Sequence, residues 1–177
     1  MHKSVRRGAR THPRNFSQPL TPFIIHTHTA TAHPAAWDAC LAALAPLGLD
    51  TSESADALGR AFGWGRSTYW RGSRERAPPD PAAVTAALAV LMGSADEGGL
   101  EMEPSDAAGV IASFPECLAL DGDGSQARAA VAKLAKEWRM VGAVAAKAVV
   151  RTPRVLGYTV DCAGDCIGEC DRCWVRF

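Results

Sequence analysis

From residue 35 onward the chain alternates apolar stretches at helical spacing with glycine and proline punctuation. Apolar residues recur three or four positions apart, and no stretch shows the strict alternation of apolar and polar residues that is typical of a strand. The pattern predicts an all-α fold. The expected helices cover residues 35–47, 52–62, 81–92, 104–113, 125–139 and 143–151.

Capping residues mark several helix starts. Asp50 and Glu53 flank Thr51-Ser52 in the order of a capping box. Asp80 and Glu103 each precede a proline, a residue that suits the first turn of a helix because it lacks an N–H group. Helix ends are expected at Gly48, Gly63, Gly93 and Gly142.

The six helices form three pairs, and the last two pairs end alike. Residues 115–118 read Pro-Glu-Cys-Leu and residues 153–156 read Pro-Arg-Val-Leu, so a P-x-x-L motif recurs after 38 residues. Proline stops the preceding helix, and the leucine three positions later is placed to pack under the pair. The first pair has Gly63-Trp64-Gly65 at the corresponding place.

Apolar stripes run along the predicted helices and are interpreted as core. They consist of Leu41, Leu44 and Leu47 in the first pair and of Ala127, Val131, Leu134 and Trp138 in the third. One helix pair cannot bury such stripes alone, so we expect adjacent pairs to stack as a short α-solenoid.

Helix pairs that end in a proline-leucine motif resemble the mitochondrial transcription termination factor (mTERF) family, whose repeats are about thirty residues long. The resemblance covers roughly residues 36–158, and the first pair departs from the motif. It implies an α-solenoid of about three repeats that binds double-stranded DNA or RNA. It also implies a role in transcription or RNA metabolism, in mitochondria or plastids.

The formal net charge of zero conceals a segregation of charge. Residues 1–37 hold five basic residues, all five histidines and no acid. This composition is typical of a transit peptide, although a disordered tail has the same character. We therefore separate residues 1–34 as a leader, residues 35–158 as the helical repeats and residues 159–177 as a tail. The leader favours import into a mitochondrion or plastid.

A second segregation separates residues 77–127, with nine acids and no base, from residues 128–154, with seven bases and one acid. The bases recur at helical spacing in two rows, as contacts to a phosphate backbone require. Two alternatives to nucleic-acid binding are that the bases form a solvated surface, or that they pack on the acidic segment 77–127 of the same chain. The predicted nucleic-acid-binding residues are Lys133, Lys136, Arg139, Lys147, Arg151 and Arg154.

Residues 60–76 mix five arginines with Phe62, Trp64, Tyr69 and Trp70. Aromatic rings between arginines can stack on unpaired bases. Interior packing between helices, with the arginines around its margin, is the interpretation we favour.

The tail carries Cys162, Cys166, Cys170 and Cys173 at turn-length spacing, with glycines between them. Four thiolates are a complete ligand set for structural Zn²⁺, which predicts an irregular cysteine-rich knuckle. An iron–sulfur cluster uses the same ligands and is the less favoured alternative. Disulfides are expected only in an oxidising compartment. Cys40 and Cys117 fall in helical contexts and are expected to be small buried side chains.

No sequence motif predicts an enzyme. The chain has no nucleotide-binding glycine loop and no HExxH motif, and histidine does not occur after residue 33, which removes the usual general base. Residues 121–124 suggest a calcium loop but lack its remaining ligands, and are interpreted as a turn. The apolar stretch 141–150 is interrupted by Lys147 and is too short to cross a membrane.

Two functions are consistent with these patterns. The first is an organellar mTERF-like protein that binds double-stranded nucleic acid through the third helix pair. The alternative is a structural or assembly protein that docks on an organellar complex, such as a ribosome or a photosynthetic assembly, without nucleic-acid specificity.

Overall fold

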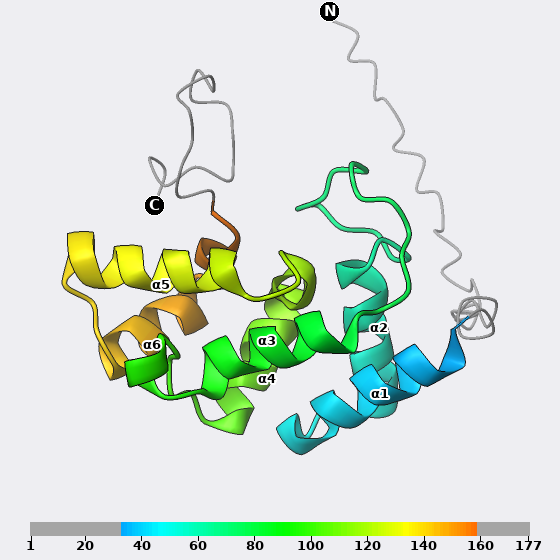
Figure 1. Ribbon diagram of the computed structural model, residues 1–177, viewed down its shortest axis with the longest axis horizontal. Helices are drawn as coiled ribbons and strands as arrows, with labels where there is room; N and C mark the ends of the chain where they lie inside the picture. Colours follow the sequence, from blue (N-terminus) through cyan, green and yellow to red (C-terminus); the bar gives the residue numbers. More distant parts are fainter. Residues whose placement is uncertain (1–32, 159–177) are drawn as a thin grey trace, which may run out of the picture.

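The computed structural model describes residues 33–158, which are all-helical and contain no strand (Figure 1). The α-helices are α1 (Pro34–Leu44), α2 (Thr51–Ala61), α3 (Pro81–Met92), α4 (Pro104–Ser113), α5 (Ser125–Trp138) and α6 (Ala143–Arg151). Short 3₁₀ helices lie at η1 (Ala45–Leu47), η2 (Ala95–Glu97), η3 (Pro115–Ala119) and η4 (Pro153–Gly157). All six predicted helices are present, within three residues at each end. The predicted leader, apart from its last two residues, and the predicted tail lie outside this range.

The predicted caps explain where α2 and α3 begin. The Asp50 carboxylate accepts a hydrogen bond from the Glu53 amide over 2.7 Å, and the Glu53 carboxylate accepts one from the Asp50 amide over 3.0 Å. Asp80 accepts from the Ala82 amide over 2.9 Å at the start of α3. These carboxylates satisfy amides that have no partner within the first turn of a helix.

Residues 121–124 form a turn, as predicted, and their carboxylates cap α5. Asp121 accepts hydrogen bonds from the Gly124 and Gln126 amides, and Asp123 accepts one from the Ser125 amide. Both carboxylates are therefore used by the chain itself, which accounts for their position without a bound cation.

Three details of the third and first pairs differ from the sequence prediction. Helix α1 ends at Leu44 and continues as η1, because Pro46 has no amide hydrogen to donate back along an α-helix. Helix α5 ends at Trp138 with Arg139 in the left-handed conformation (φ 56°), whereas Gly142 does not end a helix but is the N-cap of α6. Trp138 is 43% exposed, so its assignment to the core stripe was wrong.

The helices pack in two layers (Figure 1). Helix α3 contacts α1 on one side and α5 on the other, while α4 contacts α2 and α6 in the same way. Helix α3 carries no charged residue, and its central position explains why apolar residues occur almost all around it. Its buried residues are Ala83, Val84, Ala87, Leu88, Val90 and Leu91.

The two P-x-x-L motifs have the same local structure. Phe114 (φ −140°, ψ 70°) and Thr152 (φ −137°, ψ 72°) end their α-helices with nearly identical backbone angles. A 3₁₀ helix follows in each case, and its leucine, Leu118 or Leu156, is buried. The first 3₁₀ helix, η3, packs on α2, α3 and α4, and η4 packs on α5 and α6.

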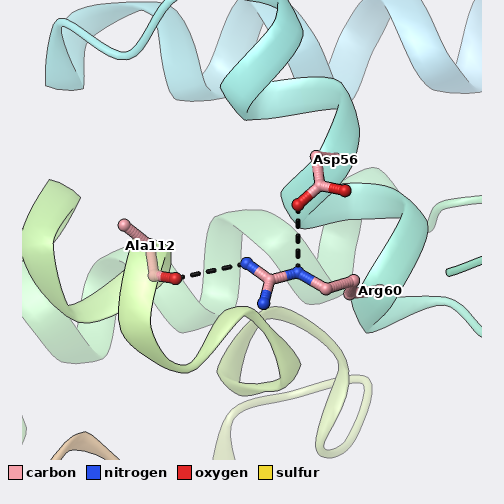
Figure 2. A network of polar contacts seen from close by, with 3 residues as sticks. All are labelled: Asp56, Arg60 and Ala112. Carbon is pink, nitrogen blue, oxygen red and sulfur yellow. Dashed lines mark hydrogen bonds and ion pairs between the residues drawn. The ribbon is translucent and has the colours of Figure 1, made fainter. Parts of the chain in front are cut away.

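A hydrogen bond connects α2 to the end of α4, and an ion pair within α2 lies beside it (Figure 2). The Arg60 Nη2 donates to the Ala112 carbonyl over 3.2 Å. The Arg60 Nε forms an ion pair with the Asp56 carboxylate over 3.1 Å. This arginine, the first of the five in residues 60–76, therefore joins two helices of the same layer.

Among the helices described, none combines the length and apolar character needed to cross a membrane.

Candidate nucleic-acid interface

Helix α6 presents two of the predicted cationic residues on one face. Ala145 and Val149 are buried against the fold, and Lys147 and Arg151 are exposed on the opposite side of the helix. Residues four apart on a helix lie one above the other, so these two cations form a row. From Trp138 to Tyr158 the chain contains no acidic residue that could neutralise this row from within the same segment.

Arg154 extends the row beyond the end of α6. It lies in η4, where it is exposed, and its Nη2 donates to the Thr68 hydroxyl over 2.6 Å. The contact joins residues 86 positions apart and places the loop between α2 and α3 beside the end of α6. Arg66 and Arg71 are exposed on this loop, two and three residues from Thr68.

The aromatic residues of this loop are held by hydrogen bonds to backbone carbonyls. Trp64 donates to Ala77 over 2.6 Å and Trp70 donates to Ala61 over 3.1 Å. The Tyr69 ring is buried and meets the Trp70 and Phe114 rings edge to face. The interior packing predicted for these aromatic residues is therefore confirmed.

Two further arginines of the loop also serve its packing. The Arg74 guanidinium lies 4.6 Å from the Trp70 ring centroid and donates to the Ala119 carbonyl over 2.6 Å. Burial lowers the pKa of Arg74 from its ordinary value. The Arg76 guanidinium lies 5.8 Å from the Trp64 ring centroid. Cations stacked on rings in this way stiffen the loop that carries Arg66 and Arg71.

The three predicted residues of the row on α5, Lys133, Lys136 and Arg139, differ in exposure. Lys133 is only 19% exposed, and its ammonium lies 3.7 Å from the Glu137 carboxylate of the same helix. Lys136 and Arg139 are exposed near the turn between α5 and α6. Helix α6 has nine residues, so roughly 13 Å separates that turn from Arg151. The six predicted residues thus extend from α5 along α6 to η4 rather than forming one cluster.

The predicted metal ligands Cys162, Cys166, Cys170 and Cys173 lie outside the described residues. Within residues 33–158 no three His, Cys, Asp or Glu side chains are placed to hold a metal ion. Cys40 and Cys117 are buried, as predicted. Burial, with a smaller effect of the Asp80 charge, raises the pKa of Cys40 to about 11. The pKa of Cys117 is raised by burial and by the charge of Glu116.

The sequence gives no local signal for the approach of the α2–α3 loop to η4, because the contacting residues lie more than 80 positions apart. The exposed valines at the start of α6 were also missed, since apolar spacing alone does not reveal which side of a terminal helix remains uncovered. No family model, curated protein or solved structure matches this chain.

Proposed function

We propose that this protein is a short mTERF-like helical-repeat protein that binds double-stranded nucleic acid. The observation that carries the proposal is the hydrogen bond from Arg154 to Thr68. It joins the row Lys147, Arg151 and Arg154 to a loop with two further exposed arginines. Cations along two adjacent segments suit successive phosphates of a duplex backbone.

Two aspects of the fold support the repeat interpretation. The motifs at Pro115 and Pro153 have matching backbone angles before them and a buried leucine after them. Each inner helix also contacts the helix two places before it and the helix two places after it, as tandem packing of helix pairs requires. Organellar transcription or RNA metabolism is the role that the resemblance and the basic leader together favour.

The aromatic rings of the loop argue for a duplex rather than a single strand. Stacking on unpaired bases needs accessible ring faces. Tyr69 is buried, and the Trp70 ring has the Arg74 guanidinium over it. The surface that remains is cationic, which suits contacts to a phosphate backbone without base recognition.

A salt titration of duplex binding tests the proposal. The full chain should bind a generic DNA or RNA duplex at low salt, with a log–log slope that reports the number of phosphates contacted. Lys147→Ala combined with Arg151→Ala should reduce the magnitude of the slope by about two, since each lost phosphate contact removes roughly one.

Lys133→Ala is the matched control, because this ammonium lies beside Glu137 and is largely buried. Its substitution should leave the slope nearly unchanged. Lack of duplex binding by the full chain at low salt would overturn the proposal and leave the assembly role as the remaining function.

A further inference from the structure

The large apolar side chains exposed within residues 33–158 all fall between positions 138 and 150. Val141 is 63% exposed, Val144 58%, Trp138 43% and Val150 38%. Three of them lie within seven residues at the turn from α5 to α6, which is one end of the layered fold (Figure 1). Exposed apolar side chains gathered at one place are typical of an interaction surface.

Three cations lie near this apolar end, and one acid, Glu137, lies beside Trp138, where it pairs with Lys133. Lys136 and Arg139 precede Val141, and Lys147 follows Val144 by three positions, which is less than one helical turn. A segment that covers the valines therefore needs apolar side chains at its centre and acidic side chains around them.

Residues 159–177 contain both kinds of side chain. Their four acids, Asp161, Asp165, Glu169 and Asp171, outnumber their two bases, Arg172 and Arg176, and their large apolar residues are Val160, Ile167, Trp174, Val175 and Phe177. The segment follows η4, which packs on both α5 and α6. Helix α5 is about 21 Å long at 1.5 Å per residue. Nineteen residues span up to roughly 60 Å when extended, so the segment is long enough to reach the turn.

We propose that residues 159–177 fold back over the turn between α5 and α6. In this arrangement apolar side chains of the segment cover Val141 and Val144, and its carboxylates lie against Lys136, Arg139 and Lys147. The inference stands without the nucleic-acid proposal. If both hold, the acidic segment competes with phosphate for the same cations.

A second copy of the chain is the less suitable occupant of this surface. A two-fold symmetric contact through the same face would bring Lys136, Arg139 and Lys147 of one copy close to the same residues of the other. The repulsion between these like charges opposes such a dimer. A segment of the same chain also has the advantage of a high effective concentration.

Zero-length cross-linking of the full chain with a carbodiimide tests the inference, because it joins a lysine to a carboxylate only when they are in contact. The chain has four lysines, Lys3, Lys133, Lys136 and Lys147. Peptide mapping should find Lys136 or Lys147 joined to a carboxylate of residues 159–177. A Lys133–Glu137 product serves as the positive control, since these groups are 3.7 Å apart. The yield of products with Lys3, which is far from the segment in sequence, serves as the background for chance encounters.

Val141→Asp combined with Val144→Asp places negative charge on the covered surface and should lower the yield of the expected products roughly tenfold. An equal mixture of unlabelled and ¹⁵N-labelled chains identifies products formed between two copies. The inference is overturned by mixed-isotope products, by a yield no higher than that of Lys3, or by products that persist in the double variant.

Discussion

The Tyr69 hydroxyl donates a hydrogen bond to the Gly157 carbonyl over 2.7 Å, although 88 residues separate them along the chain. The same carbonyl accepts from the Gln126 side chain over 3.0 Å. One carbonyl oxygen at the end of η4 thus ties together the α2–α3 loop and the first turn of α5.

Because two donors share this carbonyl, their removal should be strongly non-additive. Tyr69→Phe or Gln126→Ala alone leaves one donor in place and should cost about 1 kcal/mol of unfolding free energy. The double variant leaves a buried carbonyl without either donor, so its cost should exceed the sum of the single costs by roughly 1 kcal/mol. Urea unfolding of the four proteins measures this coupling, and strictly additive costs would contradict the shared acceptor.

Gly157 itself should tolerate no side chain. A Cβ atom at this position would lie 2.8 Å from the Phe114 ring and 2.8 Å from the Tyr69 ring. Gly157→Ala should therefore destabilise the protein by about 1–3 kcal/mol through overpacking. Gly122→Ala is the matched control, because a Cβ there meets no atom within 4 Å. Similar midpoints of thermal unfolding for both variants would argue against tight packing at Gly157.

The role of Arg154 in binding can be separated from its role in positioning the loop. Thr68→Ala removes the hydroxyl that accepts from Arg154 and leaves the guanidinium charge in place. Arg154→Ala removes both, and should reduce the salt slope of duplex binding by about one. Arg154→Lys should retain most of the slope. If Thr68→Ala lowers binding as much as Arg154→Ala does, Arg154 acts by holding the loop rather than by contacting phosphate.

The buried thiols should make the protein less stable in alkali. Burial raises the pKa of Cys40 from 9.0 to about 11 and raises the pKa of Cys117 as well. Above about pH 9 the thiols ionise in the unfolded chain and stay protonated in the folded chain. Folding therefore becomes less favourable as the pH rises, whereas below pH 9 these thiols cause no change.

For Cys117 the decrease approaches about 1.4 kcal/mol per pH unit above pH 9, the limit for one proton. Urea unfolding between pH 7 and pH 10.5 under reducing conditions measures it. Cys117→Ala should be less stable at pH 7 but should lose less stability on going to high pH. A parallel decrease in the variant and the wild type would assign the effect to other groups.

Prediction from the sequence was most accurate for features that depend on residues close together along the chain, such as helix caps and helix ends. Asp50 and Glu53 form their capping box within one turn, and Pro115 and Pro153 stop helices through their own backbone chemistry. The side on which a helix is buried depends on distant neighbours. Trp138 continues the stripe of Leu134 by its spacing, yet it lies beyond the last packed turn of α5 and is partly exposed.

The candidate interface also has one part that the sequence predicts and one part that it does not. The common face of Lys147 and Arg151 follows from helical spacing and could be read from the sequence. The proximity of Arg154 to Thr68 could not, because it depends on how a loop of almost twenty residues crosses the fold.

The central position of α3 has a consequence for how the chain unfolds. Loss of α1 on one side or of α5 on the other would expose apolar surface of α3 to water. Separation of either helix therefore destabilises α3. We therefore expect fragments cut within residues 62–80 to be poorly soluble, and a single melting transition for the intact chain.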